Sequence, residues 1–199
     1  MPEMLRSVAI GITEAELRGA RPHLRRANHA HEEGRDWLEE DLPNGAQILY
    51  MLDQGSRRVL QVQILSVIPS HGAITPHLTA MNDQYGMPTG VWDCAASDGL
   101  ITRRFTWRKN LASVMDVFLI YGERISLTLY IAPTETIQRS LALGNCRPVA
   151  RENLDSFPVV SPETMRARAG AGAPQNRGIV GRSAPGAPSI TVGASPGHP

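Results

Sequence analysis

The sequence predicts an α+β protein with two or three helices packed on one face of an antiparallel sheet of about six strands, arranged as two meanders. Two stretches combine the apolar period and the end signals of helices. Six others have the apolar runs or the apolar–polar alternation of strands. Helices do not alternate regularly with the strands, so no parallel sheet is indicated.

The first helix is expected over Thr13–Ala27, and it begins where Thr13 and Glu16 form a capping-box pattern. Pro22 lacks a backbone N–H, so we expect it to kink or split this helix. Residues 28–45 are polar and acidic and end in a turn sequence. We interpret them as a loop with at most a short helix over Asp36–Asp41.

Two strands follow, over Ala46–Leu52 and Arg57–Ile68, separated by the turn sequence DQGS. The second strand alternates apolar and polar residues, which indicates a hairpin with one buried face. The next helix covers residues 75–85, where Pro76 suits the first helical position. Gly86 fits a left-handed cap and ends it.

Four more strands form the second meander and end in a third helix. The strand over Arg124–Ile131 alternates most regularly, and the helix is expected over Thr134–Leu143. The other three strands are expected over Gly90–Cys94, Ile101–Arg108 and Ser113–Tyr121.

Composition divides the chain into a globular domain, residues 1–148, and a tail, residues 149–199, rich in Pro, Gly, Ala and Ser. Such a tail buries too little apolar area to offset chain entropy, so we expect it to be disordered. The net charge of +1 provides no global field for nucleic acid or acidic membranes. No apolar run reaches the ~20 residues of a membrane span, and no signal peptide is recognisable. We therefore expect a cytoplasmic protein, or a periplasmic one if the true start lies upstream.

The densest group of possible metal ligands is His29, His31 and Glu32. Zinc normally takes three or four ligands, and no partner motif accompanies this group. We interpret it as a solvated polar loop and expect no metal or other cofactor.

The two cysteines, Cys94 and Cys146, are too far apart for a Cys-x-x-Cys motif. They are either free thiols in a reducing compartment or, in an exported protein, a disulfide that clamps the closing segment onto strand 90–94. Asp116 falls on an otherwise apolar strand face, where a carboxylate is either partnered or functional. We expect either a place at the edge of the sheet or an arginine partner such as Arg103 for it, in preference to catalysis.

A local basic patch is formed by four residues interleaved with Phe105 and Trp107: Arg103, Arg104, Arg108 and Lys109. Aromatic and arginine side chains on a sheet can stack nucleic-acid bases. Phe105 and Trp107 share the apolar face, however, which favours a place in the core and makes nucleic-acid contact unlikely.

Two segments resemble small bacterial envelope modules. Gly11–Leu17, GITEAEL, resembles the helix start of the small lipoprotein of the outer-membrane protein assembly machine and of the β-lactamase-inhibitor-like fold. Tyr85–Thr89 followed by Trp92 resembles the helix end that leads there into an antiparallel meander. The resemblance implies an α+β module that binds other proteins or supports envelope assembly and has no catalytic residues.

We therefore expect a non-enzymatic binding or accessory module that engages a protein partner. One alternative is a small enzyme or ligand-binding domain with a site near Cys94 and Asp116. The other is an RNA-contacting protein that uses the patch from Arg103 to Lys109.

Overall fold

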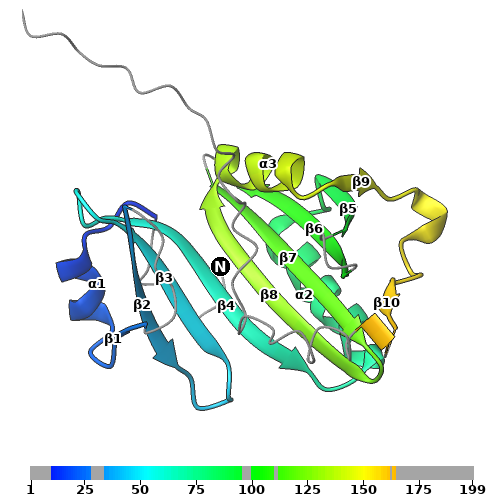
Figure 1. Ribbon diagram of the computed structural model, residues 1–199, viewed down its shortest axis with the longest axis horizontal. Coiled ribbons are helices and arrows are strands. Elements are labelled where there is room, and N and C mark those ends of the chain that lie inside the picture. The colour runs from blue at the N-terminus through cyan, green and yellow to red at the C-terminus, as the bar shows by residue number, and fades with distance from the viewer. Residues whose placement is uncertain (1–9, 28–33, 96–99, 110–111, 162, 165–199) are drawn as a thin grey trace, which may run out of the picture.

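The computed structural model describes residues 10–27, 34–95, 100–109, 112–161 and 163–164 (Figure 1). Within these residues, three α-helices pack on one ten-stranded sheet. The α+β class holds, but the expected sheet of about six strands is wrong. In chain order the elements are α1 (Glu14–Ala20), β1 (Arg25–Arg26), β2 (Arg35–Asp41), β3 (Gln47–Asp53), β4 (Val59–Ile68), η2 (His71–Ala73), α2 (Ile74–Tyr85), β5 (Gly90–Ala95), β6 (Ile101–Lys109), β7 (Ala112–Tyr121), β8 (Arg124–Pro133), α3 (Thr134–Leu143), β9 (Cys146–Pro148), η3 (Arg151–Asn153) and β10 (Val159–Val160).

Three of the four additional strands are too short to show a period in sequence. The fourth, β2, replaces the loop or short helix expected over Asp36–Asp41. Every one of its residues pairs with β3, from Arg35 opposite Asp53 to Asp41 opposite Gln47. Cross-strand pairing therefore outweighs the weak strand preference of its acidic residues.

In the strand order of the sheet, β1 to β4 form one half, and β5 to β8 form the other half in the reverse direction. The order runs β1-β2-β3-β4-β8-β7-β6-β5-β9, with β10 parallel to the end of β7. Each half consists of a helix followed by four strands, and the halves join where β4 pairs antiparallel with β8. The molecule is thus two similar units that share one continuous sheet (Figure 1).

The helices lie on both faces of the sheet, so the expectation of a single helical face is wrong. Leu17 of α1 and Met81 of α2 belong to one apolar core with the even-numbered side chains of β7. On the other face, Ile137 of α3 packs with Met115 and Val117. Because β7 carries apolar side chains on both faces, a helix on each face is needed to bury them.

The capping box expected at the start of α1 is present. The Glu16 backbone N–H bonds to Thr13 Oγ1, and the Glu16 side chain accepts the Thr13 N–H at 2.7 Å. Gly86 ends α2, as the sequence indicates, but its φ of +82° and ψ of −169° place it outside the left-handed helical region expected for the cap, in a conformation that favours glycine. Among the described helices, none is long and apolar enough to cross a membrane.

Candidate binding groove

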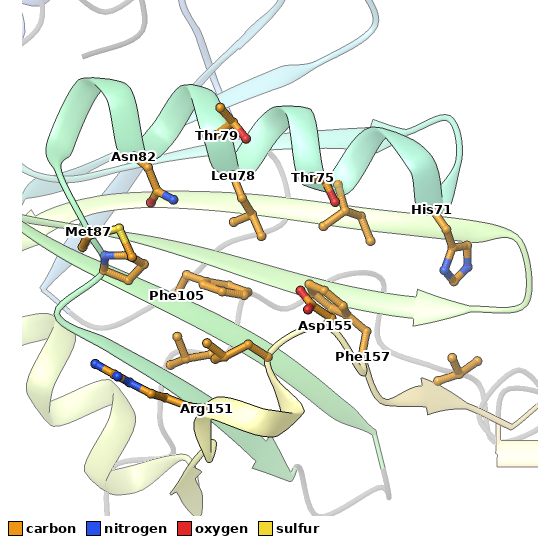
Figure 2. A pocket seen from close by; sticks show the side chains of 15 residues that line it. His71, Thr75, Leu78, Thr79, Asn82, Met87, Phe105, Arg151, Asp155 and Phe157 are labelled. Atoms are coloured by element: carbon orange, nitrogen blue, oxygen red, sulfur yellow. The ribbon is translucent and has the colours of Figure 1, made fainter.

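A groove of about 730 Å³ runs between α2 and the segment that follows β9 (Figure 2). His71 and Met87 lie at its two ends, and the side chains of Leu78 and Asn82 point from α2 toward Phe105. Its lining comes from α2 and its flanks, from β5 and β6, and from residues 151–159: His71, Ile74, Thr75, Leu78, Thr79, Asn82, Met87, Pro88, Val91, Phe105, Arg151, Leu154, Asp155, Phe157 and Val159.

Aromatic rings build the floor of the groove. Phe105 of β6 packs edge-on against Phe118 of β7, with ring centroids 5.7 Å apart. Phe157 contacts both rings, at 6.0 Å from Phe105 and 5.6 Å from Phe118. This three-ring cluster couples the wall segment to the sheet and fixes an apolar surface.

Arg103 holds the segment that forms the wall opposite α2, residues 151–159, against the sheet. Its guanidinium makes a two-pronged contact with Asp93 at 2.8 and 2.9 Å. It also donates to the carbonyls of Asn153 and Leu154 at 2.7 and 3.0 Å, and stands 5.2 Å from the Phe157 ring. Arg103 is only 2% exposed, so these charge-assisted bonds act where water does not compete.

Residues 146–160, which we call the strap, form this second wall. β9 pairs with β5 at the start of the strap, and β10 pairs with β7 at its end. The expected tail began at residue 149, so most of the strap is ordered structure in place of tail. The described residues end at 164, and the disorder expected for residues 165–199 lies outside them.

The α2 wall is attached to the sheet by polar contacts at both ends and in the middle. His71, in η2 just before α2, is hydrogen-bonded to the Gly122 carbonyl at 3.2 Å. At the far end, Trp107 Nε1 donates to the Gly86 carbonyl at 3.0 Å and to Asn82 Oδ1 at 3.3 Å. These contacts set the width of the groove.

The middle attachment is a buried pair, His77 Nε2 with Asp116 Oδ2 at 2.7 Å. Asp116 is fully buried and His77 is 26% exposed. Burial raises the pKa of Asp116, and the hydrogen bond from His77 partly opposes that rise. Burial and the nearby Asp116 charge raise the pKa of Tyr85 to about 12.

The sequence expectation for Asp116 was half right. It lies on the apolar face beside Val114 and Phe118, but Arg103 is engaged elsewhere and His77 takes its place. Within the described part of the chain, no hydrogen bond links His77 to a hydroxyl or thiol. The pair joins α2 to β7 and so acts as an attachment for α2.

The two cysteines of the chain form a disulfide. Cys94 of β5 and Cys146 of β9 stand directly opposite one another in the sheet. Cys94 is therefore bonded and is not a free nucleophile near Asp116.

The residues of the basic patch are not brought together. Neighbours along a strand point to opposite faces, so Arg103 lies on the α2 side of β6 and Arg104 on the α3 side. Both are 2% exposed, whereas Arg108 is exposed. The side chain of Lys109 and residues His29, His31 and Glu32 lie outside the described parts.

Sequence reasoning missed the strap, which supplies five lining residues of the groove: Arg151, Leu154, Asp155, Phe157 and Val159. Three apolar residues just before the glycine-rich stretch, Phe157, Val159 and Val160, could have indicated that this segment packs on the domain.

No group of three or more potential ligands within the described ranges is placed to hold a metal ion. Comparison with protein-family models, with curated proteins and with solved structures finds no match to this chain.

Proposed function

We propose that the protein is a non-enzymatic binding module that holds an extended, apolar segment of a protein partner in the groove between α2 and the strap. The observation that carries this proposal is the distribution of apolar and polar side chains in the groove. The floor is built from packed rings and aliphatic side chains. Polar and charged groups, including Asn82, Arg151 and Asp155, line the sides. An apolar centre within a polar rim is the usual anatomy of a protein interface.

Exposed apolar side chains in the lining of the groove support a protein partner. Met87 is 79% exposed and Val159 is 57% exposed, and both line the groove. Each is available for burial by a partner, and methionine adapts its shape to different partners. Large apolar side chains left in water beside a groove are typical of interaction sites.

The dimensions favour an extended segment. The 12 residues of α2 give the helical wall a length of roughly 18 Å at 1.5 Å per residue. A strand-like peptide rises about 3.3 Å per residue, so about five residues span that wall. Alternate side chains of such a peptide point to the same side, and therefore toward the ring floor.

The Cys94–Cys146 disulfide favours a location in an oxidising compartment, where such bonds persist. Such bonds are rare in reducing cytosol. We therefore favour the periplasmic alternative over the cytoplasmic expectation, in agreement with the envelope modules that two segments of the sequence resemble.

Selection from a library of displayed random peptides tests the function. We expect enriched peptides with apolar residues at alternating positions. Substituting Met87→Glu should weaken their binding at least tenfold, because a carboxylate then stands at the rim. Val67→Glu is the matched control, since Val67 is 71% exposed and lies outside the groove. Absence of enrichment, or equal loss with both variants, would contradict the proposal.

A further inference from the structure

The strap begins at the disulfide, and this position relates the bond to the groove. β9 has three residues and ends the strand order, so β5 is its only strand neighbour among the described residues. The Cys94–Cys146 bond lies within this short pairing. The next attachments along the strap are the Val149 N–H to the Val91 carbonyl at 2.9 Å and the contacts of Arg103. The disulfide therefore adds a covalent link at the end of the strap where β9 pairs with β5.

A second, independent observation is the buried guanidinium of Arg104 beside this bond. Arg104 is 2% exposed, and its hydrogen-bond partners in the described structure are two hydroxyls, Thr102 Oγ1 at 3.4 Å and Ser140 Oγ at 3.3 Å. No salt bridge within the described ranges includes it. A buried charge without a counter-ion is costly, and burial lowers the pKa of Arg104.

The guanidinium and the sulfur share the space over Gly144. A Cβ placed on Gly144 would stand 3.2 Å from Cys146 Sγ and 3.4 Å from Arg104 Nη1. On the other side, Thr102 stands opposite Cys94 and donates to the Cys94 carbonyl at 3.4 Å. An uncompensated cation thus lies near two groups that can become anions, the Tyr130 phenol and, once the disulfide is reduced, the thiol of Cys146.

We propose that the Cys94–Cys146 disulfide is redox-exchangeable and that its state controls the groove, with Arg104 stabilising the thiolates formed on reduction. This inference rests on the proposed function, because it assigns a regulation to the same groove. The reductant is a dithiol. One of its thiolates attacks Cys146 Sγ, which is half-buried, and the electron pair of the broken bond leaves on Cys94.

The second thiol of the reductant then completes the exchange. It loses its proton and attacks the sulfur that the reductant has joined to Cys146, so that Cys146 leaves as a thiolate. Two electrons have passed to the protein, and the dithiol has become a disulfide. The neighbouring guanidinium favours the charged, thiolate form of the cysteine that departs. Without the bond, β9 is held by three residues of edge pairing, and the strap wall opens more readily.

Amide hydrogen exchange on the full chain, with dithiothreitol as the reductant, tests the control of the strap. We expect reduction to speed exchange at least tenfold within residues 146–154, while β7 and β8 remain protected. Unchanged exchange in that segment would overturn the inference, as would a loss of protection in β7 and β8 as well. Because no peptide is present, this result is independent of whether the groove binds one.

Alkylation of the reduced protein by iodoacetamide tests the role of Arg104. We expect the rate at pH 7 to fall at least tenfold in Arg104→Gln and to be restored in Arg104→Lys, which keeps the charge. Arg108→Gln, which removes an exposed arginine from the same strand, should leave the rate unchanged. Identical pH profiles of alkylation for the native protein and Arg104→Gln would overturn the assignment.

Discussion

Removing the imidazole of His77 should be among the most costly single changes in this fold. Asp116 is fully buried, and its one hydrogen bond among the described residues comes from His77 at 2.7 Å. Breaking a buried pair leaves an uncompensated charge, which costs about 3–5 kcal/mol. His77 also packs edge-on against Phe118, with ring centroids 5.9 Å apart, a contact that contributes roughly 1 kcal/mol. We expect His77→Ala to lower the free energy of unfolding by about 5 kcal/mol in total.

Urea unfolding followed by circular dichroism measures this loss, and an Asp116→Leu background isolates its cause. With no carboxylate to bury, His77→Ala should there cost only the ring contact, roughly 1 kcal/mol. An equal loss in both backgrounds would refute the reasoning, because the cost would then come from packing alone.

The loss should also depend on pH in one direction. Burial raises the pKa of Asp116 in the folded state, and His77→Ala removes the contact that opposes this rise. When the pKa of a carboxyl is higher in the folded state than in the unfolded state, its contribution to stability is fully present below the unfolded-state pKa. That contribution is lost as the pH rises through the folded-state pKa. The cost of His77→Ala should therefore be largest at neutral pH and shrink as the pH falls toward about 4. A cost that grows on acidification would contradict the buried-charge explanation.

Three further results are expected. Arg103→Lys should speed hydrogen exchange at the strap, because an ammonium cannot reproduce the two-pronged contact with Asp93 and the bonds to two carbonyls; an unchanged rate would contradict this role. Gly86→Ala should lower the free energy of unfolding by about 1 kcal/mol in urea, since Gly86 has a φ of +82°; a neutral effect would argue against a backbone conformation that favours glycine at this position. Ultraviolet titration should show Tyr85 ionising with a pKa of about 12, so that stability falls as pH rises from about 10 through that value, and Tyr85→Phe should remove the step.

The long helices and strands were predictable, because the periodicity and end signals of each lie within its own stretch of sequence. The helix expected over Thr134–Leu143 is α3 with the same bounds, and the helix expected over residues 75–85 is α2 with one residue added. β2 was missed because its acidic residues weaken the strand signal, and its pairing with β3 is a tertiary effect.

The groove depends on contacts that local patterns do not encode. Arg103 was expected to pair with Asp116, but the alternation of β6 places it beside Asp93 and under the strap. The role of His77 could not be predicted from its position on α2, because its partner, Asp116, lies 39 residues away in the sequence. The strap looked like tail because glycine and proline dominate the residues that follow it, while Phe157 alone provides most of its anchorage to the ring floor.

The central claim is that the groove between α2 and the strap holds an apolar peptide segment. Amide chemical shifts of ¹⁵N-labelled full chain, recorded while a selected peptide is added, test it most directly. We predict shifts confined to residues of α2, of the strap and of the floor around Phe105. Shifts centred on β1, β2 and β3, or none at saturating peptide, would contradict the account.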